Sequence, residues 1–263
     1  MDLGLAGKRA LVMGASKGLG RAIAQSLAAE GAALVISGRD QATLDKAAAE
    51  LVAAGARAAH GVVADVAKGE QMDALADAAV KHMGGVDILV LNHGGPTPCY
   101  AAEITDAALH TWFEQIVASP IRIANRLIPA MRERRWGRVI VVGSTGMQQP
   151  IPNLALSNVL RASIWAWVKT YSGDIAKDGV TMNVIAPGSI MTDRIVQNAE
   201  SRAARAGTTK ERELEKMAEE IPAARIGAPE EFGPTAAFLA SEQAGYITGS
   251  MIRVDGGRIR GMV

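Results

Sequence analysis

Short apolar runs alternate with longer alanine-rich amphipathic runs along nearly the whole chain. This alternation restricts the fold more than any other feature of the sequence. The short runs are continuously hydrophobic, which is typical of strands covered on both faces. They predict strands at residues 9–13, 33–37, 58–63, 88–92, 138–143, 181–185 and 251–254. Helices are expected between them, starting near Gly18, Gln41, Gly69, Thr105, Asn153 and Pro229. Right-handed strand–helix–strand units predict an α/β fold, a doubly wound parallel sheet of about seven strands with helices on both faces.

The domain organisation follows from length and hydrophobicity. A chain of 263 residues that is 49% hydrophobic can bury a large core, so we expect one domain over residues 1–263. The segment 193–220 interrupts the alternation of strand and helix patterns, because it is rich in Ala, Arg and Glu and has no strand signal. It is expected to be a solvated helix pair, an insertion over the carboxyl ends of the strands where such sheets bind ligands, or both.

Charge and residue usage exclude several classes of function. Lys and Arg number 28 against 27 Asp and Glu, and this balance argues against a nucleic-acid partner. The single cysteine, Cys99, allows no intrachain disulfide and favours a reducing, cytoplasmic location. The four histidines have no metal-ligand spacing, so no metal site is expected. No apolar run approaches the about 20 residues of a membrane span, and no membrane partner is expected.

A glycine-rich segment joins the first expected strand to the first expected helix. Glycines there let the backbone turn tightly and approach a pyrophosphate, while the helix N-terminus supplies N–H donors and a positive dipole end. The position between a strand and a helix is the context that a dinucleotide-binding loop requires. The residues of this expected phosphate-binding loop are Gly14, Ser16, Lys17, Gly18, Leu19 and Gly20.

The end of the second expected strand predicts which nicotinamide cofactor is preferred. An acidic residue there would accept a hydrogen bond from the ribose 2′-hydroxyl of NAD and repel a 2′-phosphate. The chain has Arg39 at this point, and Lys17 lies in the glycine loop. Two cations favour NADP(H) over NAD(H). Asp40 is the one nearby acid, and we expect it to cap the next helix instead.

With these motifs the chain resembles the short-chain dehydrogenase/reductase family over nearly its whole length. Residues 14–20 match the family's TGxxxGxG loop, with Met13 where Thr is usual. The resemblance implies a Rossmann-like fold, an adenine site at Asp65 and Val66, and a nicotinamide site at the PGxIxT match 187–192. The residues that it adds to the cofactor site are Asp65, Val66, Asn92, Gly94, Arg161, Pro187, Gly188, Ile190 and Thr192. The segments 225–231 and 254–257 also match.

The resemblance implies hydride transfer between nicotinamide and a small-molecule carbonyl or alcohol substrate. In the family a Ser polarises the carbonyl, a Tyr transfers the proton, and a Lys four residues later binds ribose and lowers the Tyr pKa. Ser144 matches the Ser, but the Tyr and Lys positions hold Ser157 and Arg161. The family's helix-side Asn is also absent, and counting from Trp112 places its position at Ser119.

These replacements change the expected chemistry. Arg161 can bind ribose hydroxyls but stays charged at every accessible pH. Ser157 is an aliphatic alcohol, a far weaker acid than a phenol with its pKa of about 10, and is not expected to be an efficient proton donor. His93 and Tyr100 are the alternative candidates for the donor. Tyr171 is ten residues beyond Arg161 on one expected helix, roughly 15 Å away along the axis.

Three functions fit this sequence. The first is an NADP(H)-dependent carbonyl reductase or alcohol dehydrogenase with an atypical catalytic site at Ser144, Ser157, Arg161 and His93. The second is a non-redox enzyme, because the three residues Ser144, Ser157 and Arg161 resemble the Ser-Tyr-Arg set of the halohydrin dehalogenases. The third is a nucleotide-binding protein without turnover, a sensor or partner subunit.

The assembly expected is a homotetramer. The run that starts at Asn153 is apolar around more of its circumference than one core-facing stripe requires. Members of the family commonly form tetramers through this helix and the preceding one, and through the C-terminal strand.

Overall fold

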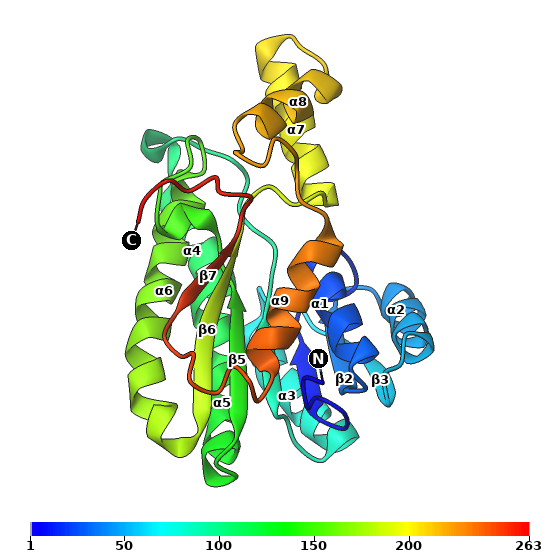
Figure 1. Cartoon of the computed structure of the whole chain (residues 1–263). Helices are drawn as coiled ribbons and strands as arrows, with labels where there is room; N and C mark the ends of the chain where they lie inside the picture. Colours follow the sequence, from blue (N-terminus) through cyan, green and yellow to red (C-terminus); the bar gives the residue numbers. More distant parts are fainter. Residues whose placement is uncertain (1, 263) are drawn as a thin grey trace.

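A seven-stranded, wholly parallel sheet forms the centre of the protein, as seen in a computed structural model that describes residues 2–262 (Figure 1). The strand order is β3-β2-β1-β4-β5-β6-β7. The strands are β1 (Arg9–Val12), β2 (Ala33–Gly38), β3 (Ala58–Val63), β4 (Ile88–Leu91), β5 (Gly137–Val142), β6 (Val180–Pro187) and β7 (Met251–Val254). The expected doubly wound sheet is therefore confirmed.

Helices cover both faces of the sheet. The larger helices are α1 (Gly18–Ala29), α2 (Gln41–Ala53), α3 (Gly69–Met83), α4 (Asp106–Phe113), α5 (Ser119–Glu133), α6 (Ala155–Ile175), α7 (Asp193–Ala206), α8 (Lys210–Glu219) and α9 (Pro229–Ala240). Short helical turns lie at Ala101–Glu103, Thr145–Met147 and Ala176–Asp178, and a π-helical turn lies at Glu114–Ala118. None of the helices within residues 2–262 combines the length and apolarity needed to cross a membrane.

Successive residues of a strand contribute their side chains to two separate hydrophobic cores, one on each face of the sheet. Ala10 and Val12 of β1 belong to the core under α1, α2 and α9, whereas Leu11 and Met13 belong to the core under α3, α5 and α6. This division follows from the period-two geometry of a strand, which points successive side chains to opposite faces. All four side chains are fully buried, and this explains why the strand runs are hydrophobic without alternation.

The order of the strands reverses at β1. This strand pairs with β2 on one side and with β4 on the other, with Ala10 opposite Leu34 and Ile88. The crossovers from β1 and β4 therefore leave in opposite directions, and a crevice opens beyond their carboxyl ends. The glycine loop follows β1 at this crevice, and the Asn92–Gly95 segment follows β4.

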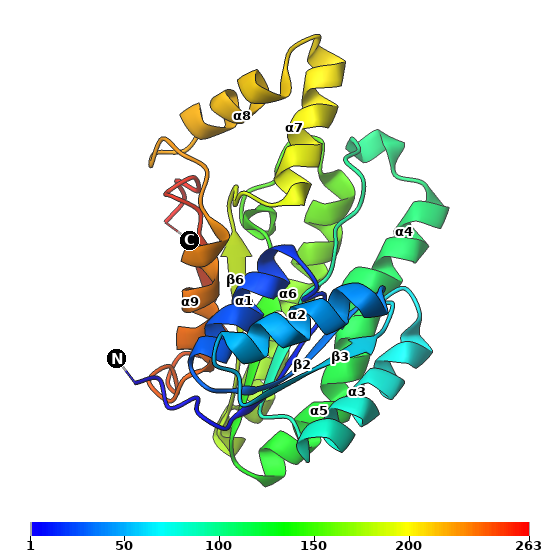
Figure 2. The same ribbon diagram turned by 90° about the vertical axis from the view of Figure 1, so that its right-hand side faces the viewer.

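The segment 193–220 forms the helix pair α7 and α8, which projects beyond the carboxyl end of β6 (Figure 2). Its inner side is small and apolar, with Ala199, Ala203 and Met217 buried. Its outer side carries ion pairs, such as those of Arg212 with Glu215 and Glu219. A solvated helix pair is therefore present, and its position is compatible with a cover over the crevice.

Two helix boundaries differ from the sequence-based expectation. The helix expected from Thr105 does begin there, with Thr105 as its N-cap, but the π-helical turn Glu114–Ala118 separates α4 from α5. A π turn adds a residue to the helical repeat and rotates everything after it. The helix expected from Asn153 begins at Ala155, because Asn153 has a left-handed backbone with φ of 56°.

Close packing of α1 on α9 depends on Gly233. A Cβ at this position would collide with the carbonyl oxygen of Ala22 and the hydroxyl of Ser26 on α1. We predict that Gly233→Ala lowers the free energy of unfolding by about 1–3 kcal/mol, because the two helices must separate.

Gly173→Ala is the matched control, since a Cβ at Gly173 on α6 meets nothing within 4 Å. It is expected to raise the free energy of unfolding by about 0.5–1 kcal/mol. Urea denaturation at one fixed protein concentration measures both variants. Equal effects of the two substitutions would contradict the packing argument.

Candidate active site

The glycine loop between β1 and α1 presents free backbone donors to the crevice. Gly14 and Gly18 have φ of 58° and 61°, which side chains rarely tolerate. The N-cap of α1 is Lys17, whose side chain caps none of the first backbone N–H groups. These donors and the positive end of the helix dipole form a cradle for phosphate groups. The predicted loop therefore has the left-handed glycines and the uncapped helix start that the sequence analysis expected.

Asn92 connects the glycine loop to the end of β4. Its side-chain amide is buried and donates to the carbonyl oxygens of Met13 and Gly14, each over 3.1 Å. A Cβ on Gly20 would lie 2.6 Å from the same nitrogen. Asn92, predicted as a cofactor residue, therefore shapes the loop instead of facing the crevice directly.

The end of β2 is where the sequence predicts the adenosine half of a dinucleotide. The hydroxyl of Ser16 lies 3.3 Å from the point where a Cβ on Gly38 would be, so Ser16 lies against the end of β2, one residue before Arg39. Arg39 is exposed, and its guanidinium has no hydrogen bond or ion pair within the described part of the chain. Asp40 caps α2 as expected, and the hydrogen bonds from Thr43 lower the pKa of its carboxyl.

The two expected adenine residues follow β3. Asp65 accepts a hydrogen bond from the backbone of Ala67 over 3.0 Å, which holds the turn after the strand. Asp65 and Val66 are both half-buried. They lie beyond the carboxyl end of the strand next to β2, on the same side of the sheet as Arg39.

Lys17 faces α7 and not Arg39. Its ammonium pairs with the carboxylate of Asp193 over 2.9 Å, and hydrogen bonding to Lys17 lowers the pKa of that carboxyl. The methyl group of Thr192 lies 3.9 Å from the Cβ position of Gly18, so the start of α7 touches the glycine loop. The crevice is therefore bridged on its outer side, and the two predicted cations are not brought together.

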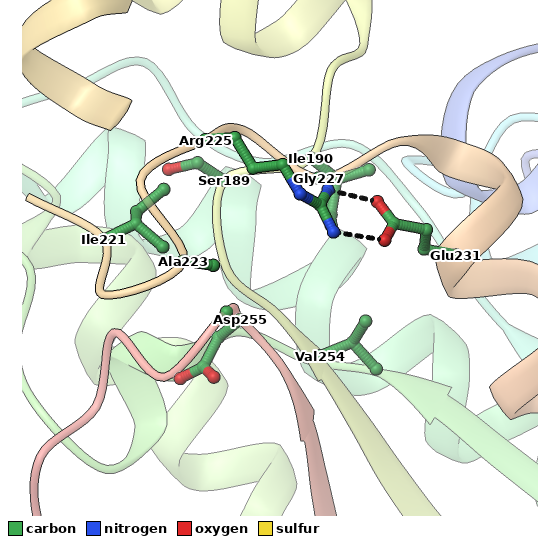
Figure 3. A pocket seen from close by; sticks show the side chains of 10 residues that line it. Ser189, Ile190, Ile221, Ala223, Arg225, Gly227, Glu231, Val254 and Asp255 are labelled. Carbon is green, nitrogen blue, oxygen red and sulfur yellow. Dashed lines mark hydrogen bonds and ion pairs between the residues drawn. The ribbon is translucent and has the colours of Figure 1, made fainter. Parts of the chain in front are cut away.

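The segment 187–192 forms the opposite wall of the crevice. Pro187 ends β6, the backbone N–H of Gly188 donates to Val254, and Ile190 forms a bridge with Gly227. Behind this segment lies a cavity of about 110 Å³, bordered by Ser189, the Arg225–Glu231 ion pair and Asp255 (Figure 3). The matched 225–231 and 254–257 motifs therefore support the wall from behind.

Ser144 follows β5 and is half-buried. Its hydroxyl oxygen accepts a hydrogen bond from the backbone of Gly146 over 3.0 Å. Within residues 2–262 the hydroxyl proton has no acceptor, so it is free to point to a substrate. Asn158 fixes the rest of this loop by pairing with both backbone groups of Ile151. Sequence analysis missed Asn158, which lies one residue after Ser157.

Arg161 is buried under this loop. One guanidinium nitrogen donates to the carbonyl oxygen of Val142 over 3.0 Å, two residues before Ser144. Burial and, to a smaller extent, the charge of Arg194 lower the pKa of Arg161 to about 10. The group therefore remains a fixed positive charge at neutral pH, as expected.

Ser157 is half-buried one turn before Arg161, and its hydroxyl makes no hydrogen bond to the residues that the structure describes. Tyr100, the alternative phenol, is 58% exposed beside the start of α6, where Ala155 donates to Cys99. Tyr171 is near the far end of α6, and its ring lies tilted by 38° against that of Trp167. Neither phenol occupies the Ser157 position.

The expected position for the helix-side polar residue is corrected by the structure. The hydroxyl of Ser119 donates to the carbonyl oxygen of Val66, so it serves the segment after β3. The residues that pack against Leu156 and Leu160 of α6 are Ile116 and Val117. The π turn is the physical reason, since it rotates the helix between Trp112 and Ser119 relative to a regular α-helical count.

His93 lies beside Arg161 with its ring in a defined tautomer. Its Nδ1 is 2.5 Å from the carbonyl oxygen of Gly94, an atom that can only accept, so Nδ1 carries the proton. Burial and the charge of Arg161 lower the His93 pKa to about 3. The neutral ring dominates at pH 7, and its Nε2 is an acceptor.

Comparison with known proteins gives consistent matches over the whole chain. A family model described as enoyl-(acyl carrier protein) reductase matches residues 14–258. Human dehydrogenase/reductase SDR family member 4 is 35% identical over 96% of this chain and 88% of that protein. The 3-oxoacyl-(acyl-carrier-protein) reductase FabG of Escherichia coli (strain K12) is 32% identical over 95% and 97% of the two chains. The structure of L-sorbose reductase from Gluconobacter frateurii, complexed with NADPH and L-sorbose, matches with a TM-score of 0.94, 34% identity and full coverage of both chains.

The lowered pKa of His93 predicts the protonation state of its ring in the folded protein. Between about pH 8 and pH 5 the ring stays neutral, because burial and Arg161 oppose a second proton. A long-range proton–nitrogen correlation spectrum reports this, and the spectrum of His93→Gln assigns the signal. A titration midpoint between about pH 6 and pH 7, the normal range for histidine, would contradict the prediction.

The lowered pKa of His93 also makes the stability of the folded protein depend on pH. The unfolded chain takes up the His93 proton near pH 6.5, while the folded protein resists it to about pH 3. His93 therefore makes the folded state less stable as the pH falls through this window. His93→Gln should reduce the slope of stability against pH there.

Proposed function

Because the chain belongs to the short-chain dehydrogenase/reductase family of oxidoreductases, we propose that it is an NADP(H)-dependent enzyme that interconverts a small carbonyl compound and an alcohol. The main support is one juxtaposition. The uncapped start of α1, held by Asn92, lies across the crevice from the 187–192 wall, while Arg161 lies under Ser144 at the inner end.

The cofactor site in this proposal follows the observed geometry. The backbone donors from Ser16 to Gly20 hold the pyrophosphate, and Asp65 and Val66 border the adenine. Arg39 and Ser16 bind the 2′-phosphate, since both border the end of β2 and the nearby carboxylate of Asp40 is directed to the N-terminus of α2. The neighbouring L-sorbose reductase structure contains NADPH, which agrees with this preference.

The nicotinamide half would rest against Pro187, Gly188, Ile190 and Thr192. The ribose hydroxyls would be held by Arg161, whose free guanidinium donors can form two hydrogen bonds in one plane. Gly94 supports this end through its carbonyl bond to His93. When bound, the reduced cofactor supplies a hydride to the carbonyl carbon of the substrate.

The protein's contribution to the chemical step is electrostatic. As the hydride adds, negative charge develops on the substrate oxygen. The Ser144 hydroxyl donates to that oxygen, and the fixed charge of Arg161 stabilises it in a site of low dielectric. Neither Ser157 nor neutral His93 has a pKa near the working pH, so neither is an efficient general acid, and the proton that completes the alcohol comes from solvent after the hydride has transferred. His93 Nε2 accepts a hydrogen bond from the water that delivers this proton.

A homotetramer is part of the proposal, together with the cytoplasmic location expected from Cys99. Apolar side chains remain exposed on α4 and α6, with Phe113 at 47% and Val159 at 53%. The strand β7 is also an edge of the sheet. Burying both surfaces against further copies would remove them from water. Sedimentation should give four times the 27.5 kDa chain mass, and a monomer at micromolar concentration would contradict this.

The cofactor preference predicts the effect of Arg39→Gln. Loss of a charge-assisted hydrogen bond to the 2′-phosphate should raise the Kd for NADPH by about 10- to 100-fold. The Kd for NADH should change by less than about twofold, because NADH has no group at this position. Titration of nucleotide fluorescence measures both constants.

The matched control is Lys46→Gln on the exposed side of α2, which removes the same charge. It should leave both affinities unchanged. Tighter binding of NADH than NADPH by the unmodified protein would overturn the proposed preference.

The proposed mechanism predicts different effects on kcat for substitutions of Ser144 and Ser157. Ser144→Ala should lower kcat for ketone reduction by about 10- to 100-fold, because it removes a donor to a charged oxygen. Ser157→Ala should change kcat by less than about threefold, because this hydroxyl transfers no proton. The assay follows NADPH oxidation with the best substrate of a ketone screen.

Ser163→Ala is the control on the same helix, since its hydroxyl only bonds back to Val159. A loss of turnover in Ser157→Ala as large as that in Ser144→Ala would show that Ser157 is the proton donor after all.

A further inference from the structure

Two guanidinium groups from different helices converge at Gly95. The Nη2 atoms of Arg161 on α6 and Arg194 on α7 each lie 3.8 Å from the point where a Cβ on Gly95 would be. Gly95 follows β4, directly after the segment that holds His93. Both cations therefore border the inner end of the crevice, where the substrate must meet Ser144.

Neither guanidinium has an acidic partner among residues 2–262. Arg161 donates to the carbonyl oxygen of Val142, and Arg194 donates to that of Pro96. A guanidinium has five N–H donors, so each group keeps donors for a ligand. The acid nearest in sequence, Asp193, is paired with Lys17.

The electrostatics of this pair favour an anion. Burial lowers the pKa of Arg194, and burial together with the Arg194 charge lowers the pKa of Arg161. Two like charges that face one point without a counter-ion repel each other, and an anion placed between them relieves that repulsion. Neutral His93 adds no charge at neutral pH.

The side chain of Arg194 points away from the loop that is expected to hold the cofactor phosphates. Asp193 and Arg194 are adjacent on the first turn of α7, yet they reach different loops. Asp193 reaches the glycine loop through Lys17, whereas Arg194 reaches Pro96 in the loop after β4. The phosphate cradle lies on the Asp193 side, and the catalytic groups lie on the Arg194 side. Arg194 keeps part of its surface in contact with solvent.

We propose that Arg194 binds a carboxylate carried by the substrate, with the nearby charge of Arg161 adding electrostatic attraction, so that the enzyme reduces oxo acids and oxidises hydroxy acids. This inference rests on the proposed function, and it adds the substrate class. The planar fork of a guanidinium matches the two oxygens of a carboxylate. The carboxylate is not consumed: the hydride goes to the ketone carbon and a solvent proton to its oxygen.

The test compares oxo acids with their uncharged amides, for example 4-oxopentanoate with 4-oxopentanamide, and the 2-oxo and 3-oxo pairs likewise. The unmodified enzyme with NADPH should prefer the best acid over its amide by about 10-fold or more in kcat/KM. Arg194→Met should abolish this preference, mainly by raising KM for the acid. Arg194→Lys should restore part of it, because the charge returns without the fork.

The affinity for NADPH decides whether Arg194 serves the substrate. Arg194→Met should leave the Kd for NADPH within about twofold of the original, because the cofactor phosphates lie on the other side of α7. A fall in NADPH affinity would assign Arg194 to the cofactor and overturn the inference. Equal kcat/KM for acids and amides in the unmodified enzyme would also overturn it.

Calorimetry separates this inference from the proposed function. The non-reacting complex with NADP⁺ should bind the oxo acids more tightly than the amides, and Arg194→Met should lose that difference. Binding of this kind without NADPH oxidation would refute the redox function and leave the anion site standing. Ketone reduction without any preference for acids would refute the anion site and leave the redox function standing.

Discussion

The side-chain amide of Asn92 holds together the two chain segments between which the crevice opens. By donating to Met13 and Gly14, it fixes the end of β1 against the end of β4, where the order of the strands reverses. The left-handed turn at Gly14 and the close approach at Gly20 leave room for this nitrogen and for nothing larger. The start of α1 then points its free N–H groups into the crevice. Every cofactor contact proposed above depends on this arrangement.

In the proposed mechanism, a fixed charge at the inner end of the crevice takes the place of a protein acid. A phenol of the family's usual kind would give up its proton, but the chain has an aliphatic hydroxyl at Ser157 and a permanent cation at Arg161. The buried guanidinium is held by Val142 and cannot lose its proton near neutral pH. Such a site can stabilise a developing oxyanion without transferring a proton to it. The same cation depresses the pKa of His93, so the one imidazole nearby is also withdrawn from acid catalysis.

Much of this molecule could be predicted from its sequence, because its strands and its phosphate loop are set by local patterns. The continuous apolar runs correspond to the seven strands within one or two residues, and Asp40 caps α2 as expected. The sequence-based predictions fail where residues that are far apart in the sequence are in contact. The pairing of Lys17 with Asp193 joins residues 176 apart, and no local signal announces it. Ser119 was misplaced because the π turn has no pattern in apolar periodicity.

Arg194 was missed for a related reason. Its sequence context is a solvated, Arg- and Glu-rich helix, in which one more arginine is unremarkable. Only the fold brings it to Gly95 and Arg161. Its position two residues after the 187–192 motif was the one available signal, since that motif ends at the crevice. Asn158 was likewise hidden beside the substituted Ser157, although its two bonds to Ile151 hold the loop that follows Ser144.

The central claim is that fixed charge at Arg161, and not a protein acid, supports the reaction. The most direct measurement is the single-turnover rate of NADPH oxidation against pH, in light and heavy water, with a saturating ketone. The account predicts a rate that is flat from about pH 6 to pH 9, with a solvent isotope effect close to 1, because no protein group moves a proton as the hydride transfers. A clear ionisation in that range together with a large solvent isotope effect would contradict it, since both would reveal a proton donor within the site.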